Sequence, residues 1–504
     1  MHTGFHRAAL ESILAKVLYL LSRLAIPPMV LTQVGLPEYG LWSIAFVLVG
    51  YLGLSVSGLA TVYVREIARA YERQDALYAS GMLSTGVALA LFLGGGFCLG
   101  LSLCTPWILK SFAVSPALYQ LATLLIGVTT LVFLADLTLG AWGYVLHGLN
   151  RVNEQQRIWV ASFMLEWVII ASMLYLGLGM TALLGGFLLR YIFSICCAWW
   201  RVKSIWPELK MHPRHINQLY LKPFLHFGLK SQLSDGLAMI LHSADRILAG
   251  ISFGSASTAI LDLGSKLPAT AISISSGISL VVLPRSACMN EAQLAEFYPK
   301  ALRLSVFSLL FIMPLLVACA PAISLAWLGL RPESHLIVQT LLWVTPAWHL
   351  HTLTGCASSA LRGQGQLRLE FVYHGLRAIA LGLVFYLSTS LAHFIALFAI
   401  GSACSALCYL FLASHRLSMS SGQIFKQALF PLGLCYSAAY SLVLLWPWHL
   451  INNRHMALLE LLQMSSLFTL LLAGLSWLII LKPHEKTWLS NLAAKLFKHE
   501  VSHA

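Results

Sequence analysis

Residues 79–103 read ASGMLSTGVALALFLGGGFCLGLSL and contain no charged side chain. About 20 consecutive apolar residues are enough for a helix to cross a bilayer. The run is continuous, whereas a strand of a membrane β-barrel would alternate polar and apolar residues over a shorter segment. This stretch therefore predicts a membrane-spanning helix, and similar stretches recur along the chain on both sides of it.

Fourteen segments of this kind are recognisable, joined by short links in which Gly, Pro and Asn occur. They lie near residues 13–34, 39–62, 79–103, 117–146, 158–177, 180–201, 228–251, 256–284, 301–322, 335–360, 370–388, 391–414, 428–448 and 457–481. The chain of 504 residues is 58% hydrophobic and 10% charged, whereas soluble proteins carry about 25% charged residues. The composition excludes a soluble enzyme and predicts an all-α polytopic membrane protein.

The cations are distributed unequally between the two sides of the predicted membrane. The chain has 32 Lys and Arg against 19 Asp and Glu, a formal net charge of +13. If the N-terminus is cytoplasmic, the inner loops and tails hold 22 cations and the outer loops hold 3. Because cytoplasmic loops carry the excess of Lys and Arg, both termini are predicted to be cytoplasmic. Orientation accounts for the positive charge, so no nucleic-acid partner is expected.

An internal repeat divides the predicted spans into two sets of six. Gly148 and Gly363 follow the fourth and tenth spans and are 215 residues apart, and Lys16 and Lys230 are 214 apart. Parallel repeats around a central substrate site occur in transporter folds. We therefore expect two parallel six-helix bundles around a central cavity. The predicted parts are an N-terminal bundle (1–201), a cytoplasmic linker (202–227), a C-terminal bundle (228–414), and two further helices with a tail (415–504).

Ionisable residues within predicted spans are costly and mark functional sites or structural pairs. The cations that we assign to the depth of the membrane are Arg23, Arg190, Arg246 and Lys266, and the acids are Asp136, Glu166, Asp235, Asp245 and Asp262. Glu166 and Arg190 lie twelve residues either side of Leu178, at equal depth in an antiparallel hairpin. Asp262 and Lys266 are four residues apart on one helical face. We interpret Glu166, Arg190 and Asp262 as members of structural ion pairs.

Polar residues form helical stripes on equivalent spans of the two bundles. Lys16 and Arg23 share one face of span one, Arg246 lies on the stripe of span seven, and Lys266 on that of span eight. A polar stripe on a membrane helix faces protein or water and not lipid. These stripes therefore predict helix faces that line the central cavity.

No motif for a cofactor, a metal or a nucleotide stands out. The ten cysteines form no CxxC pair and no Cys/His set with zinc-ligand spacing. No glycine-rich run continues into the Lys-Ser/Thr of a P-loop. Transport is therefore expected to draw on an ion gradient, with Asp136, Asp235 and Asp245 as candidates to carry a proton or bind sodium.

The first two spans carry a recognisable pattern. RLAIPP at 23–28 is followed by GLPEYGLW at 35–42, and His147-Gly148 and Arg362-Gly363 end two later spans. Over roughly residues 10–415 the chain resembles the Wzx-type polysaccharide flippases of the multidrug/oligosaccharidyl-lipid/polysaccharide (MOP) exporter superfamily. The resemblance implies an inner-membrane transporter, and not an enzyme, that moves an undecaprenyl-diphosphate-linked sugar repeat unit outward by alternating access. Its implied partners are the lipid-linked oligosaccharide, the bilayer and other polysaccharide assembly proteins.

By the same likeness, Arg23, Arg246 and Lys266 would meet the diphosphate or an anionic sugar. Lys16 joins this substrate-binding set because it shares the polar face of Arg23. The chain departs from the family in one respect, because four cations against five acids make the intramembrane set nearly neutral. That balance keeps a multidrug or cation antiporter of the same superfamily as an alternative. A membrane-integral glycan polymerase or glycosyltransferase is a second alternative, although no clustered carboxylate pair supports it.

Overall fold

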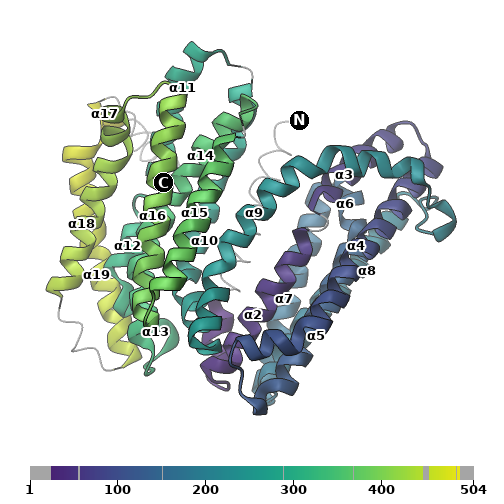
Figure 1. Ribbon diagram of the computed structural model, residues 1–504, viewed down its shortest axis with the longest axis horizontal. Helices are drawn as coiled ribbons and strands as arrows, with labels where there is room; N and C mark the ends of the chain where they lie inside the picture. The colour runs from purple at the N-terminus through teal and green to yellow at the C-terminus, as the bar shows by residue number, and fades with distance from the viewer. Residues whose placement is uncertain are drawn as a thin grey trace, which may run out of the picture. The chain divides into compact units, whose positions relative to one another are not determined.

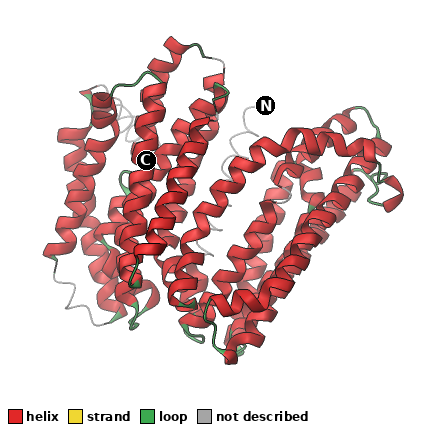
Figure 2. Ribbon diagram, viewed as in Figure 1, coloured by secondary structure: helices red, strands yellow, loops and turns green. Residues whose placement is uncertain are grey.

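The computed structural model describes residues 24–54, 57–149, 151–287, 289–366, 368–446, 453–483 and 485–487. Within these residues every element of regular secondary structure is a helix, and no strand occurs (Figure 2). The prediction of an all-α chain is therefore confirmed for the described part of the molecule.

The chain forms two compact units (Figure 1). The N-terminal unit comprises Met1–Lys266 and His374–Phe394, and the C-terminal unit comprises Leu267–Tyr373 and Ile395–Ala504. The first unit contains α2 (Leu36–Leu54), α3 (Ser57–Glu72), α4 (Ala76–Ser111), α5 (Tyr119–Leu139), α6 (Ala141–Gly148), α7 (Val152–Tyr175), α8 (Met180–Ile205) and α9 (Leu221–Phe253), with the short helices η1 (Pro116–Leu118), η2 (Pro213–His215) and η3 (Gln218–Tyr220). The second contains α11 (Glu291–Leu309), α12 (Ile312–Ala318), α13 (Ala320–Leu328), α14 (Ser334–Gly363), α17 (Ser421–Ile424), η4 (Phe425–Leu429), α18 (Phe430–Leu445), α19 (Arg454–Leu475) and η6 (Ser476–Ile480). Three helices contribute to both units: α10 (Ser255–Ala287), α15 (Arg368–Leu387) and α16 (Leu391–Arg416).

Ten helical segments of the described chain are long and apolar enough to cross a membrane. Each predicted segment from 39–62 onward corresponds to a helix or a run of helices. The long helices α9, α10 and α14 are not among the ten. Two of them, α9 and α10, carry the polar stripes predicted for spans seven and eight. The chain is a multi-pass membrane protein, and the total of fourteen spans stays a prediction.

Some predicted single spans are broken in the structure. Residues 117–146 form α5 and α6, which meet at Gly140. A Cβ on Gly140 would lie 2.2 Å from the carbonyl oxygen of Asp136 and 2.7 Å from its Oδ1, so only glycine fits here. Residues 301–322 become parts of α11, α12 and α13, with prolines at the first turns of the two shorter helices. Proline is tolerated there because the first-turn N–H groups have no helical partner.

Helices of the N-terminal unit pack side by side as antiparallel neighbours. The α7–α8 hairpin turns at Gly177 and Gly179, whose φ angles are 76° and 52°, values that favour glycine because it has no Cβ. Helix α5 packs on α8, and α2 packs on both α5 and α9. The polar side chains of α5 to α8 are thereby brought into one bundle.

The segment between α8 and α9 is bound along the first turns of α4. The backbone N–H groups of Lys210 and His212 donate to the hydroxyls of Ser80 and Ser84 at 2.9 and 3.1 Å. The N–H of Asn217 donates to the Thr85 hydroxyl at 3.1 Å. Serine and threonine side chains of a helix thus replace the backbone partners that an irregular segment lacks.

In the C-terminal unit, α18 and α19 pack on α12 and α13. A residue that follows α19 contacts α11. The buried Arg303 of α11 donates to both carboxylate oxygens of Glu485 at 2.6 and 2.7 Å. The same guanidinium donates to the carbonyl of Ile480 at 2.9 Å. The appended helices are therefore an integral part of this unit.

Candidate functional site

The residues predicted from the sequence fall into three places. Lys16 and Arg23 lie outside the described residues, and Asp235 lies in α9 among the side chains that are not described. Arg246, Asp262 and Lys266 come together where α9 meets α10. Asp136, Glu166 and Arg190 gather among α5, α7 and α8.

Asp262 holds two cations at the α9–α10 hairpin. Arg246 Nη1 donates to Asp262 Oδ1 at 3.1 Å, and Lys266 Nζ donates to Asp262 Oδ2 at 2.8 Å. Lys266 also donates to the hydroxyl of Tyr39, from α2, at 2.9 Å. We call Tyr39, Arg246, Asp262 and Lys266 the Asp262 cluster.

The hairpin turn explains why these residues meet. Gly254, between the helices, has a φ of 87°, and Arg246 and Asp262 lie eight residues on either side of it. The Thr258 hydroxyl donates to the carbonyl of Arg246 at 3.1 Å and the Ser257 hydroxyl to that of Ala249 at 2.7 Å. These bonds hold the two helices in register, at equal depth for the paired charges.

Helix α2 approaches the hairpin at Gly40, next to Tyr39. A Cβ on Gly40 would lie 2.0 Å from the carbonyl oxygen of Ser255 and 2.6 Å from its carbon. Both atoms belong to the backbone at the start of α10, so no side-chain rotation relieves the clash. The glycine therefore permits the close approach that lets Tyr39 reach Lys266.

Gly40→Ala is expected to destabilise the protein by about 1–3 kcal/mol or more, as overpacking does in well-packed cores. The matched control is Gly53→Ala on the same helix, where the nearest atom, from Phe133, is 3.6 Å from the new Cβ. The melting temperature of each purified variant provides the measurement. A Gly40→Ala variant that melts with the wild type would contradict this close contact.

A buried carboxylate and a further arginine adjoin the cluster. Asp245 is 1% exposed, its Oδ1 accepts no hydrogen bond from the described residues, and Arg246 Nε lies 3.9 Å away. Arg377 of α15, 7% exposed, donates to the carbonyl of Leu241 at 3.0 Å and is close enough to act on Asp245 electrostatically.

Arg377 corrects the balance of charges drawn from the sequence. Arg377 was not among the four cations predicted at membrane depth, although it lies in the predicted span 370–388. With Arg246 and Lys266 it supplies three positive charges against the two carboxylates of Asp245 and Asp262. At their formal charges these five groups sum to one net positive charge.

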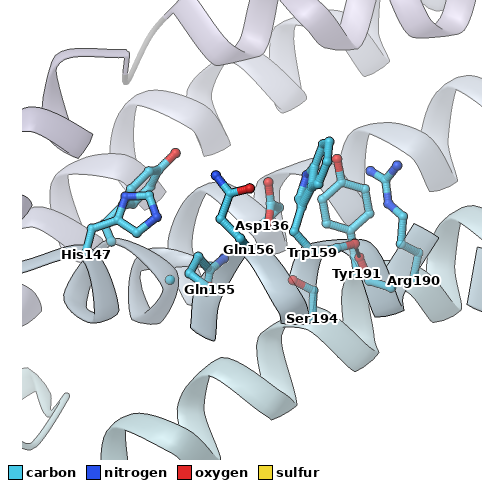
Figure 3. A pocket seen from close by; sticks show the side chains of 12 residues that line it. Asp136, His147, Gln155, Gln156, Trp159, Arg190, Tyr191 and Ser194 are labelled. Carbon is cyan, nitrogen blue, oxygen red and sulfur yellow. Dashed lines mark hydrogen bonds between the residues drawn. The ribbon is translucent and has the colours of Figure 1, made fainter. Parts of the chain in front are cut away.

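A second site is a polar cavity within the N-terminal unit. It has a volume of about 450 Å³ and is formed by α5, α6, α7 and α8. Its lining residues are Asp136, Gly140, Gly143, Tyr144, His147, Gln155, Gln156, Trp159, Ser162, Arg190, Tyr191 and Ser194. Figure 3 shows His147 and Arg190 at opposite ends of the row of labelled side chains, with Asp136 between them. We call this space the α5–α8 cavity.

Arg190 forms one wall of this cavity and is itself paired. Its Nη1 donates to Glu166 Oε2 at 3.2 Å, and both side chains are nearly buried. The guanidinium carbon lies 4.1 Å from the ring centre of Tyr191 and 4.6 Å from that of Phe163. Stacking on aromatic faces and pairing with a carboxylate together stabilise a buried arginine.

The uncharged residues of the cavity were not predicted from the sequence. Gln155 and Gln156 precede the predicted span 158–177, whereas α7 begins at Val152. No group of three or more potential His, Cys, Asp or Glu metal ligands occurs in the described part of the chain. Asp136 lines the cavity together with Arg190, whose ion-pair partner is Glu166.

Known proteins share this fold. Among curated protein sequences no significant match is found. Lipid II flippase MurJ, in an inward closed conformation, is similar with a TM-score of 0.69 and 14% identity, covering 93% of this chain and 98% of that chain. An inward-facing MATE family multidrug resistance transporter of the MOP superfamily is similar with a TM-score of 0.64 and 18% identity, over 80% of this chain and 94% of that chain. A MOP superfamily transporter from Pyrococcus furiosus has a TM-score of 0.53 and 17% identity, over 82% and 95%.

At these identities the similarity shows the fold alone, a polytopic helical fold shared with the MurJ and MATE structures. The sequence itself carries a more specific signal. The model of the family described as polysaccharide biosynthesis protein matches residues 34–331. This match covers more than half of the 504 residues, and the chain therefore belongs to the polysaccharide biosynthesis protein family.

Proposed function

We propose that this protein is a flippase for a polyprenyl-diphosphate-linked oligosaccharide. It moves the sugar unit from the cytoplasmic to the outer leaflet of the inner membrane by alternating access, with both termini in the cytoplasm. Family membership indicates polysaccharide biosynthesis, and the 22-to-3 distribution of cations supports the orientation. The observation that carries the proposal is the cluster of intramembrane cations around Asp262.

The chemistry of this cluster suits a diphosphate. Arginine offers a planar fork of donors that matches phosphate oxygens, and lysine adds a point charge. The side chains of Arg246 and Lys266 are each 22% exposed, so a ligand can reach them. Arg23 and Lys16 join them in this proposal on the strength of the sequence alone.

We propose that an ion gradient drives the cycle. Asp245, Asp136 and Asp235 are the candidate acids, and the hydrogen-bond vacancy at Asp245 Oδ1 favours Asp245 as a proton or sodium site. A buried carboxylate oxygen that accepts no hydrogen bond is costly, so binding of a proton or a sodium ion at that oxygen would relieve the cost.

Export in a deletion strain tests the proposal. Arg246→Ala and Lys266→Ala are each expected to reduce surface polysaccharide at least tenfold, because loss of a charge-assisted contact costs about 1.5–3 kcal/mol. Lys300→Ala is the control, since Lys300 is 72% exposed and its ion pair among the described residues is a surface pair with Glu296. Membrane abundance of each variant is measured by immunoblot. Ion coupling is tested separately in vesicles, where collapse of the ion gradients is expected to stop translocation. Normal export by abundant Arg246→Ala and Lys266→Ala variants would refute the substrate site.

A further inference from the structure

We propose that the α5–α8 cavity is a binding subsite for an uncharged sugar unit of the transported oligosaccharide. This inference rests on the proposed function and names a second contact for its substrate, inside the N-terminal unit. The cavity is a separate space from the Asp262 cluster, because none of its lining residues belongs to that cluster.

The size of the cavity indicates a ligand larger than an ion. Its volume of about 450 Å³ lies within the range of about 300–1,000 Å³ for small-molecule sites. A single water occupies only about 30 Å³ in the liquid. A cavity that served a proton or a sodium ion alone would not need this room.

The lining presents the groups that a sugar requires. Gln155 and Gln156 offer amide donors and acceptors, and Ser194 offers a hydroxyl that does both. Sugar hydroxyls likewise donate and accept. Trp159 supplies aromatic surface, whose negative face attracts the weakly positive C–H groups on one side of a pyranose ring.

An unused hydrogen-bonding atom points to a missing partner. Gln155 Oε1 is buried and accepts no hydrogen bond from the described residues. A buried acceptor left without a partner costs about 1–3 kcal/mol, and a sugar hydroxyl would satisfy it. Gly143 makes room for this amide, because a Cβ at Gly143 would lie 2.8 Å from Gln155 Nε2.

The charges select the kind of sugar. The positive charge of Arg190 is balanced by Glu166 at 3.2 Å. The carboxylate of Asp136, which also lines the cavity, then makes the net charge of these three groups negative. A carboxylate accepts hydrogen bonds from hydroxyl groups but repels another anion. The cavity therefore suits a neutral sugar and disfavours a uronic acid or a phosphate.

Two aromatic contacts hold the cavity walls in place. Trp159 packs edge to face on Phe163 with ring centres 4.5 Å apart, and Tyr191 packs on Phe187 at 4.9 Å. Pre-positioned aromatic groups reduce the entropy lost when a ligand binds. Both contacts lie among α7 and α8, the antiparallel hairpin of this unit.

Binding of soluble sugars by the full-length protein in lipid nanodiscs tests the inference. Saturation-transfer NMR is recorded with methyl glycosides of a neutral hexose, an N-acetylhexosamine and a uronic acid. Transfer to at least one neutral or N-acetylated glycoside is expected, with loss in Trp159→Ala and Gln155→Ala. Trp167→Ala is the control, because Trp167 is a 37%-exposed tryptophan on the same helix. Gly143→Ala, which crowds only the movable end of Gln155, should weaken the signal in a protein that still folds.

Three results would overturn the inference. They are absence of transfer to every glycoside, an undiminished signal in Trp159→Ala and Gln155→Ala, and binding of tetraphenylphosphonium in place of any sugar. Translocation of lipid-linked oligosaccharide is measured in parallel. Sugar binding without translocation would count against the proposed flippase alone, whereas translocation without sugar binding would count against the cavity alone.

Discussion

Arg190→Ala is expected to destabilise the protein by about 3–5 kcal/mol, the cost of leaving one partner of a buried ion pair without the other. Glu166 is only 2% exposed in the pair, so its charge cannot be hydrated in place. The double variant Arg190→Met/Glu166→Leu should recover most of this loss, because an apolar pair of similar volume removes both charges. Thermal melting of the purified variants gives the measurement.

Arg201→Ala on the same helix is the control for Arg190→Ala. Arg201 donates to Glu154 at 2.5 and 3.0 Å, but its side chain is 39% exposed. An exposed pair contributes about 0–1 kcal/mol, so this variant should melt close to the wild type. If Arg190→Ala melted like Arg201→Ala and lost only export, Arg190 would have to be assigned to the substrate and not to the fold.

Hydropathy predicted the positions of the described helices from residue 39 onward, ten segments of which are long and apolar enough to cross a membrane, because lipid imposes a continuous apolar surface. It was less informative about helix ends. The predicted span 158–177 begins six residues after the start of α7 at Val152, since the polar first turns of that helix line a cavity. Gln155 and Gln156 fall outside the predicted span, and both line the α5–α8 cavity.

Antiparallel hairpins made part of the site predictable. Equal distances from a turn place residues at equal depth, and the structure brings Arg190 to Glu166 and Arg246 to Asp262. A contact from a third helix cannot be predicted from distances along the sequence in this way. Arg377 reaches α9 from α15, 136 residues away along the chain from the carbonyl that it contacts. Only tertiary packing brings it near Asp245.

The Asp262 carboxylate occupies the donors that a diphosphate would use. It accepts from Arg246 and from Lys266 through different oxygens, at 3.1 and 2.8 Å. Two oxygens on one centre are also what a phosphate offers. In the proposed flippase, substrate binding would therefore have to replace at least one of these contacts, and Asp262 would set the affinity for the substrate.

Asp262→Asn is consequently expected to raise the affinity for a lipid diphosphate. Each charge-assisted hydrogen bond contributes about 1.5–3 kcal/mol, and each 1.4 kcal/mol is a factor of ten in affinity, so weakening one competing contact should strengthen binding at least tenfold. Tighter binding should slow release, and export should fall although the protein remains in the membrane. Calorimetric titration of the purified protein with farnesyl diphosphate measures the affinity.

A surface variant separates this effect from a general change of charge. Glu296→Gln removes one negative charge from a side chain that is 78% exposed and paired only with Lys300 among the described residues, so it should leave diphosphate affinity unchanged. If Asp262 serves only the fold, Asp262→Asn should lower the melting temperature without any gain in affinity, because Arg246 and Lys266 would lose the anion that balances them. Equal affinities in the wild type, Asp262→Asn and Glu296→Gln would show that the carboxylate does not compete with substrate. A gain confined to Asp262→Asn, and reduced by high salt because screening weakens charge attraction at a partly exposed site, would identify Asp262 as the internal competitor of the diphosphate.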